Sequence, residues 1–358
     1  MKKRVVVAMS GGVDSATTAA ILKEKGYEVI GATMHLMPKR YEPGVERFDG
    51  CCSLTAIDDA RRVCEKLGIA HYVLNFRDAF QREVIDNFYQ EYSQGRTPNP
   101  CIRCNRFVKF EALFKKALEL DADYLATGHY GRIVYDKNSN RYLLKKGVDS
   151  TKDQSYVLYG LTQEQMSRLL MPLGKWTKEQ TRKKAKEVDL TIFNKEESQE
   201  ICFVPDNEYA SFLTRHFPEI NNQGPILNMA GEVIGKHKGI IHYTVGQRKG
   251  LGITNDVPLY VVRIDKEKNA VIVGEEQDLY SKELLAKDVN LIAWDKIKEN
   301  ETVFAQIRYN SSAAKATIAK KNGLLKVNFE KPQKAISPGQ AVVFYKKDVV
   351  VGGATIIG

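Results

Sequence analysis

Cys101 and Cys104 stand three residues apart in the loop stretch NPCIRCN, just before an amphipathic run. A cysteine reacts as its thiolate. With a pKa of about 8.5, only about 3% of a thiol is ionised at neutral pH, so a reactive cysteine needs a nearby positive charge or helix N-terminus. Arg103, Arg106 and Lys109 surround Cys104, and a helix pattern begins just afterwards. These features favour Cys104 as an activated sulfur.

The remaining cysteines do not complete a zinc site in the sequence. Structural zinc needs four ligands, usually two CxxC pairs or one pair with two histidines, and no second pair exists. Cys51 and Cys52 are adjacent, whereas Cys64 lies on the apolar face of a predicted helix and is interpreted as a core residue. Cys202, in SQEICFV, is by itself interpreted as a buried strand residue.

A glycine-rich turn follows the first predicted strand, in the stretch MSGGVDSATTAAILKEKG. Ser10, Gly11 and Gly12 allow a tight turn whose N–H groups approach a ligand, and the helix that begins near Asp14 directs its positive end to the same place. The pattern therefore predicts an anion site. It is not a Walker loop, because no lysine follows the glycines. The order strand, SGGVDS, helix resembles instead the PP-loop of ATP pyrophosphatases, which cleave ATP to AMP and pyrophosphate, and Asp14 could then hold Mg²⁺ against the phosphates.

The elements around these residues predict three segments. The β-branched runs KRVVVAM, YEVIGATM, HYVLNF and DYLATGH alternate with helical patterns, which indicates an α/β domain with a parallel, Rossmann-like sheet over residues 1–205. Beyond it the strands are short and divided by turns. We expect a small β-rich connecting module over residues 206–275 and a C-terminal antiparallel β-barrel over residues 276–358.

Composition and charge restrict the class of protein and its partner. The 358 residues are 43% hydrophobic and 27% charged, as in an ordinary globular protein. We expect a cytoplasmic protein without a membrane segment, because no apolar run approaches the ~20 residues that cross a bilayer and no signal peptide precedes the first strand. The formal net charge of +10 favours a polyanionic partner such as nucleic acid.

Six stretches together resemble the bacterial tRNA-specific 2-thiouridylases, in order along nearly the whole chain. They are SGGVDS, GRTPNPCIRCNRFVKF, ATGHY, DSTKDQSYVLY, ICFV and HYTVGQRKGLG. The resemblance implies a PP-loop enzyme that uses ATP and Mg²⁺ to adenylate the 2-oxygen of the wobble uridine of tRNA and then replaces that oxygen with sulfur. It also implies a sulfur-carrier protein or cysteine desulfurase as donor, and we expect a monomer.

The resemblance assigns a role to each matching residue. Cys104 would be the nucleophile and Cys202 the carrier of a persulfide, and the two would form a disulfide during turnover. The residues implied at the ATP site are Ala8, Met9, Ser10, Gly11, Gly12, Val13, Asp14, Ser15, Met34 and Gly128. Those implied to contact the flipped base or the rest of the tRNA are Asn99, Pro100, Cys101, Lys152, Asp153, Gln154, Arg308 and Tyr309.

One position departs from the family pattern and leaves a second route open. Many members have Asp where this chain has Cys101. Cys101, Cys104 and Cys202 together are enough thiolates to hold a [4Fe–4S] cluster with one open iron, which would carry the sulfur in place of a persulfide. Two further hypotheses are a PP-loop synthetase acting on a small molecule, and a non-enzymatic RNA-binding protein whose CxxC belongs to a zinc site.

Overall fold

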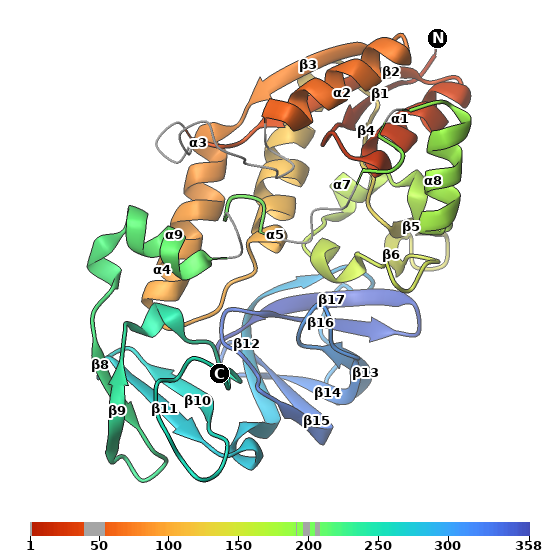
Figure 1. The fold of residues 1–358 in the computed structure, drawn as a ribbon. Coiled ribbons are helices and arrows are strands. Elements are labelled where there is room, and N and C mark those ends of the chain that lie inside the picture. Colours follow the sequence, from red (N-terminus) through yellow and green to blue (C-terminus); the bar gives the residue numbers. More distant parts are fainter. Residues whose placement is uncertain (1, 39–53, 191, 196–200, 205–207) are drawn as a thin grey trace. The chain divides into compact units, whose positions relative to one another are not determined.

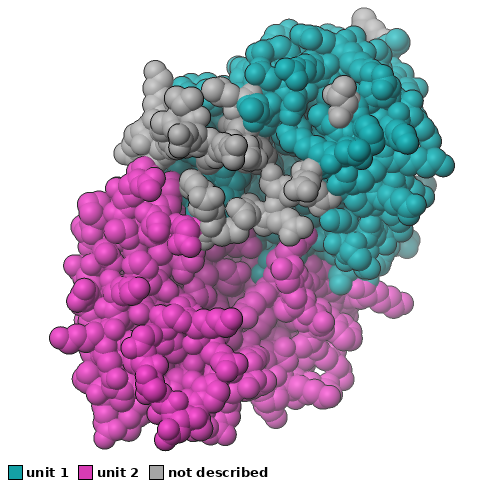
Figure 2. Space-filling model, viewed as in Figure 1, with its two compact units in different colours: residues 1–85, 100–207, 348–350 teal, residues 86–99, 208–347, 351–358 magenta. Residues whose placement is uncertain are grey.

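The chain folds into two compact units, each made of segments that are distant in the sequence (Figures 1 and 2). The computed structural model describes residues 2–38, 54–190, 192–195, 201–204 and 208–358. Unit 1 comprises residues 1–85, 100–207 and 348–350, and unit 2 comprises residues 86–99, 208–347 and 351–358. None of the helices in the described ranges combines the length and the apolar character needed to cross a bilayer.

A parallel sheet forms the centre of unit 1, as the sequence predicted. Among the described residues its strand order is β3-β2-β1-β4-β7, and every neighbouring pair is parallel. Val5, Val6 and Val7 of the middle strand are fully buried, as expected for a strand that is covered on both faces. The strands are β1 (Arg4–Ala8), β2 (Glu28–His35), β3 (Ala70–Asn75), β4 (Tyr124–Ala126) and β7 (Leu169–Leu170).

Helices of unit 1 share an apolar core with this sheet (Figure 1). The helix that follows β1 is rich in alanine and threonine, and these small side chains allow close packing. Each of three helices contributes a buried alanine to the common core, namely Ala16, Ala60 and Ala185. The helices are α1 (Val13–Glu24), α2 (Leu54–Lys66) and α8 (Lys178–Glu187).

Two helical stretches of the chain contain π-helical segments. In the first, α3 (Arg77–Phe80) continues through the π-helical residues Gln81–Ile85 into α4 (Asp86–Ser93). In the second, α5 (Pro100–Arg103) continues through Cys104–Leu113 into α6 (Phe114–Glu119). The second π-helical segment begins at Cys104, and π-helical segments are frequent at functional sites.

A β-hairpin, a loop and two further helices follow β4 in unit 1. β5 (Gly131–Asp136) and β6 (Arg141–Lys146) form an antiparallel hairpin, which the loop 147–154 and a 3₁₀ turn follow. α7 (Gln163–Ser167) begins with a capping box made by Thr162 and Gln165, and α8 begins with a second one made by Thr177 and Gln180. Such reciprocal caps satisfy backbone N–H groups and fix where each helix starts.

Unit 2 contains a four-stranded sheet and a closed six-stranded β-barrel. The sheet has the order β10-β11-β8-β9. The barrel has the order β12-β15-β14-β13-β16-β17, and pairing of β12 with β17 closes it, which confirms the predicted C-terminal barrel. The elements are α9 (Tyr209–His216), β8 (Gly224–Leu227), β9 (Val233–His237), β10 (Tyr260–Asp265), β11 (Ala270–Gly274), β12 (Tyr280–Leu291), β13 (Glu301–Gln306), β14 (Ala314–Lys321), β15 (Leu324–Lys334), β16 (Ala341–Lys346) and β17 (Val349–Ile356).

Candidate active site

The turn between β1 and α1 can only be built with glycine at position 11. Gly11 has φ +68°, and a Cβ on it would lie 2.3 Å from the carbonyl oxygen of Ala56. Ser15 braces the turn, because its hydroxyl accepts the N–H of Ser10 at 3.1 Å and donates to the carbonyl of Gly12 at 3.0 Å. The turn therefore presents its backbone at the positive end of α1, as an anion site requires.

The expected nucleotide residues lie at the carboxyl edge of the parallel sheet. Ala8 ends β1, Met34 is the penultimate residue of β2, and Gly128 follows β4. A Cβ on Gly128 would lie 2.8 Å from the carbonyl carbon of Asp14, so its backbone packs directly against the start of α1. The carboxyl edge is where α/β sheets bind their ligands. The structure thus brings Gly128 to the glycine turn from more than 100 residues away.

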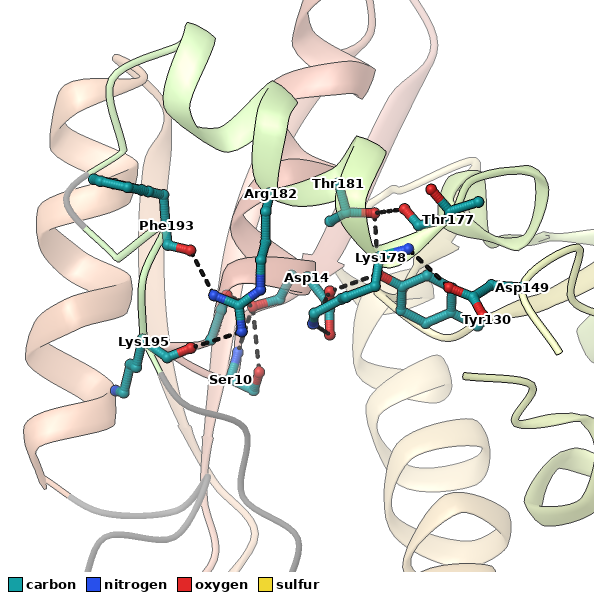
Figure 3. A network of polar contacts seen from close by, with 12 residues as sticks. Ser10, Asp14, Tyr130, Asp149, Thr177, Lys178, Thr181, Arg182, Phe193 and Lys195 are labelled. Atoms are coloured by element: carbon teal, nitrogen blue, oxygen red, sulfur yellow. Dashed lines mark hydrogen bonds and ion pairs between the residues drawn. The ribbon is translucent and has the colours of Figure 1, made fainter. Parts of the chain in front are cut away.

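Asp14 is engaged by a lysine that the sequence analysis did not identify (Figure 3). The Nζ atom of Lys178 lies 2.8 and 2.9 Å from the two carboxylate oxygens of Asp14, and the hydroxyl of Tyr130 lies 2.9 Å from Oδ1. The Lys178 side chain is 11% exposed and that of Asp14 is 31% exposed. No lysine follows the glycines in the sequence, but the fold supplies one from 164 residues away.

A second lysine reaches the glycine turn itself. The Nζ atom of Lys195 lies 3.2 Å from the carbonyl oxygen of Gly11 and 2.6 Å from Oδ2 of Asp59. Arg182 of α8 holds the same segment by donating to the carbonyl oxygens of Phe193 and Lys195, at 2.8 and 3.3 Å (Figure 3). The anion site therefore has a cation on two sides, in addition to its backbone N–H groups.

The contacts that the described residues make with Asp14 do not use all of its acceptor positions. A carboxylate offers about four acceptor positions, and Lys178 and Tyr130 use two on Oδ1 and one on Oδ2. Mg²⁺ is commonly held by one or two carboxylates together with phosphate oxygens. One carboxylate at this position therefore fits Mg²⁺ that arrives with a triphosphate.

Cys101 and Cys104 lie on a helix and not in a loop, which corrects the sequence interpretation. The helix begins at Pro100, a residue suited to a first helical position because its φ is fixed and it has no N–H to satisfy. Cys101 is exposed, whereas Cys104 is buried at the start of the π-helical segment. Asn105, next in sequence, is also buried and donates to the carbonyl of Val157 at 3.2 Å.

The positive charges next to Cys104 are partly compensated. The guanidinium of Arg103 donates to the carbonyl of Glu83 and to its carboxylate, both at 3.0 Å. It also lies over the ring of Phe107, with Cζ 4.2 Å from the ring centroid. Arg103 thus fixes the helix of Cys104 against residues 77–85, and only part of its charge can act on the thiol.

Cys202 lies in a turn and is half-buried, so its interpretation as a buried strand residue was wrong. The neighbouring ring of Phe203 packs edge-on against Phe80, with ring centroids 5.7 Å apart. Phe80 is three residues before Glu83, the partner of Arg103. The segments of Cys104 and Cys202 are therefore both attached to the same helical stretch, residues 77–85.

Cys64, the remaining cysteine among the described residues, is shielded from reaction. Cys51 and Cys52 lie outside the described residues. Cys64 is fully buried in the core of unit 1, as the sequence predicted, and burial raises the pKa of its thiol to about 12. Among the described residues, no three His, Cys, Asp or Glu side chains come together as a metal-binding group. Cys101, Cys104 and Cys202 therefore do not fit a [4Fe–4S] cluster in this arrangement.

Two of the expected tRNA residues of unit 1 have structural tasks in the loop that follows β6. The carboxylate of Asp153 accepts the N–H groups of Gly147 and Ser155 at 2.9 and 3.1 Å, and the hydroxyl of Ser155 at 2.8 Å. Gln154 bonds to the backbone of Tyr130. Lys152 belongs to the same loop and is half-buried. The loop is thus organised by the side chains of its own expected contact residues.

In unit 2, Arg308 joins the two β modules. Its guanidinium donates to the carbonyl oxygens of Val245 and Ala335 and, at 3.0 Å, to the hydroxyl of Ser337. Arg308 and Ala335 line a cavity of about 280 Å³, and Tyr309, next to Arg308 in sequence, is 41% exposed. An exposed aromatic ring next to a guanidinium suits an unpaired nucleotide.

Asn99, the last expected contact residue, ends a segment that the barrel end holds in place. Gln340 donates to the carbonyl oxygens of Thr97 and Pro98, at 2.9 and 3.4 Å. The N–H of Thr97 donates to the carbonyl of Pro338 at 2.8 Å. The backbone immediately before Asn99 is therefore fixed within unit 2.

Family models match nearly the whole chain in three consecutive pieces. Their descriptions are tRNA methyl transferase HUP domain for residues 3–206, tRNA methyl transferase PRC-barrel domain for residues 210–275, and aminomethyltransferase beta-barrel domain for residues 281–356. Full-length relatives carry a different reaction in their names. The tRNA-specific 2-thiouridylase MnmA of Acetivibrio thermocellus is 56% identical over 99% of both chains. That of Halothermothrix orenii is 55% identical over 99% of this chain and 98% of the relative.

Solved structures resemble the chain more weakly. A 4-thiouridine synthetase in complex with RNA and ATP covers 61% of this chain and 51% of its own, at 18% identity and a TM-score of 0.39. Likeness at this level carries no argument. The full-length relatives, which are more than half identical, decide the family.

Proposed function

Because this chain belongs to the tRNA-specific 2-thiouridylase family, and is therefore a tRNA sulfurtransferase that uses ATP, we propose that it replaces the 2-oxygen of the wobble uridine with sulfur carried by Cys202. The observation that carries the proposal is that one compact unit contains both the predicted nucleotide site and the two cysteines. The glycine turn with its two lysines lies in the same unit as Cys104 and Cys202, whose segments share one helical stretch. Family membership excludes the small-molecule synthetase and the non-enzymatic RNA-binding protein.

The first step activates the base. The 2-oxygen of the uridine attacks the α-phosphorus of ATP, the bond from that phosphorus to the bridging oxygen breaks, and pyrophosphate leaves with the electron pair. The glycine turn and α1 hold the phosphates, and Lys178 and Lys195 offset the charge that develops on the leaving oxygen. Mg²⁺ held by Asp14 would supply further charge neutralisation of the phosphates. The Asp14 carboxylate also fixes the position of the Lys178 ammonium.

The second step delivers sulfur. The terminal sulfur of a persulfide on Cys202 attacks C2 of the adenylated base, and AMP leaves with the former 2-oxygen. The thiolate of Cys104 then attacks Sγ of Cys202, and the electron pair of the broken S–S bond stays on the sulfur bound to C2. The products are 2-thiouridine and a Cys104–Cys202 disulfide. A dithiol reductant returns both cysteines to thiols, and a persulfide-bearing donor protein reloads Cys202.

The remaining assignments complete the proposal. Residues 1–205 carry the chemistry, residues 206–275 connect, and residues 276–358 bind tRNA. Asn99, Pro100 and Cys101 surround the flipped base, while residues 152–154 together with Arg308 and Tyr309 hold the rest of the tRNA. Because the three thiols do not come together as a cluster site among the described residues, we prefer the persulfide route. We also propose that the protein acts as a monomer in the cytoplasm.

Cysteine variants test this proposal. Cys104→Ala and Cys202→Ser should each abolish 2-thiouridine, measured by mass spectrometry of digested tRNA, and should leave the affinity for an ATP analogue unchanged because the glycine turn is elsewhere. Thiouridine formed by the double variant would overturn the persulfide route. Cys101→Ala separates the routes further. Its effect should be mild if a persulfide carries the sulfur, whereas loss of activity in step with lost iron would favour the cluster.

A further inference from the structure

The loop of residues 147–155 is bonded to two residues that contact Asp14. On one side, the carboxylate of Asp149 accepts the backbone N–H of Lys178 at 2.9 Å. On the other side, Gln154 forms two bonds with the backbone of Tyr130. Its Oε1 accepts the N–H of Tyr130 and its own N–H donates to the carbonyl of Tyr130, both at 2.9 Å. Lys178 and Tyr130 both contact the Asp14 carboxylate through their side chains (Figure 3).

The loop is held together by hydrogen bonds between its own residues. Asp149 accepts the N–H and the hydroxyl of Thr151, at 3.0 and 2.7 Å. Asp153 accepts three further bonds from Gly147 and Ser155. The bond from the Thr151 hydroxyl, together with the N–H of Lys178, lowers the pKa of the Asp149 carboxyl, so this carboxylate stays charged at neutral pH. These internal bonds link the attachment of the loop at Lys178 to its attachment at Tyr130, and the N–H of Val148 adds a bond to the carbonyl of Gly174 at 3.0 Å.

Tyr130 connects the loop to the start of α1. Its side chain is 2% exposed and packs in an apolar cluster with Ile21 and Leu173, so the ring has little freedom to turn. Its hydroxyl lies 2.9 Å from Oδ1 of Asp14 and 3.0 Å from the hydroxyl of Thr181. A phenol has one proton, and a carboxylate is the stronger acceptor, so the proton points to Asp14.

We propose that Tyr130 is a positioning residue that couples the loop of residues 147–155 to the Asp14–Lys178 pair. An RNA strand held by the loop and a nucleotide at the glycine turn then strengthen each other's binding. The inference rests on the proposed function, because it takes tRNA as the ligand of residues 152–154. Coupling of this kind is reciprocal, so tRNA tightens nucleotide binding by the same factor by which nucleotide tightens tRNA binding.

The test compares nucleotide affinity with and without tRNA. The dissociation constant of α,β-methylene-ATP, whose α–β bond cannot be cleaved, is measured by calorimetry in the absence of tRNA and at saturating tRNA. We expect the wild type to bind the analogue at least about fivefold more tightly with tRNA. In Tyr130→Phe, which loses only the hydroxyl, the two constants should agree within about twofold.

A matched control and a second variant keep the result interpretable. Tyr135→Phe removes an exposed hydroxyl from the neighbouring hairpin, where it bonds Asn140, and should keep the wild-type ratio. Asp149→Ala removes the bond between the loop and the backbone of Lys178 and should also reduce the ratio. Thermal unfolding of each variant shows whether it is folded. If Tyr130→Phe does not fold, Asp149→Ala alone decides.

Three outcomes would overturn the proposal. They are a wild-type ratio near one, a Tyr130→Phe ratio equal to that of the wild type, and an equal loss of the ratio in Tyr135→Phe. Failure of the proposed function is distinguishable from all three, since thiouridine in the digested tRNA is measured separately. A chain that couples tRNA to nucleotide and forms no thiouridine would preserve this inference and refute the function.

Discussion

Replacing Lys178 with methionine removes the ammonium group that faces both oxygens of Asp14, while keeping most of the length of the side chain. Two consequences follow from the structure. Asp14 loses the ammonium of Lys178 and retains the hydroxyl of Tyr130. The leaving pyrophosphate loses one of the two lysines that we assign to it among the described residues, Lys195 being the other. The first affects stability and the second affects the rate of adenylation.

The two effects differ in size. The Asp14 side chain is 31% exposed, so water can replace part of the lost contact, and the folded state should lose only about 1 kcal/mol. The loss of a preorganised charge that stabilises a transition state typically reduces kcat by about 100- to 1,000-fold, or about 3–4 kcal/mol. We therefore expect a folded protein that binds tRNA and releases pyrophosphate at least about 100-fold more slowly.

The assay follows pyrophosphate release with saturating tRNA and ATP, together with urea unfolding of the same preparations. Lys183→Met is the matched control, because it removes an exposed lysine from the same helix, α8. A Lys178→Met protein whose rate lies within about threefold of the Lys183→Met rate would refute the role given to Lys178. A loss of stability large enough to unfold the protein would show that the pair is structural.

Three further predictions concern residues with different tasks. Gly11→Ala should abolish nucleotide binding. A positive φ costs about 1–3 kcal/mol for alanine, and the new Cβ would overlap the carbonyl oxygen of Ala56. Wild-type affinity measured by calorimetry would contradict this. Cys64 has a pKa raised to about 12 by burial, so it should stay protonated and resist iodoacetamide at pH 8 until urea unfolds the protein. Labelling of Cys64 in the folded protein as fast as that of exposed Cys101 would contradict this. Arg308→Ala should lower the free energy of unfolding of unit 2 by about 1–3 kcal/mol, because the carbonyl of Ala335 and the hydroxyl of Ser337 lose their donor. Arg263→Ala, which removes an exposed arginine, should not lower it. Equal stability of the two variants would limit Arg308 to a role in binding RNA.

The elements that the sequence predicted correctly are those whose signal is local. Each β-branched run of the first half forms a strand of the parallel sheet, and the turn-divided segments of the last third close into a barrel. Strand type depends on a few neighbouring residues, and a glycine at a positive φ, such as Gly11, is recognisable from its turn alone. The sequence therefore predicted the anion site at the glycine turn, but not the lysines that lie beside it.

The contacts that the sequence did not reveal join residues distant in the chain. Lys178 begins an ordinary basic helix with its own capping box, and no local feature distinguishes it from the other lysines of α8. Arg103 was expected to lower the pKa of Cys104, but its partner Glu83 lies twenty residues earlier. Cys202 lies in a strand-like apolar pattern of the sequence, but the structure places it in a turn, next to Phe203 whose ring packs against Phe80. Tertiary packing decided each case.

Isotopic labelling of the substrate oxygen tests the central claim most directly. A tRNA that carries ¹⁸O at C2 of the wobble uridine is incubated with the enzyme, ATP and a persulfide donor, and the AMP released in one turnover is analysed by mass spectrometry. If the 2-oxygen attacks the α-phosphorus and leaves with AMP, each thiouridine formed should be matched by one AMP bearing a single ¹⁸O. Thiouridine accompanied by unlabelled AMP would contradict activation of the base by adenylation.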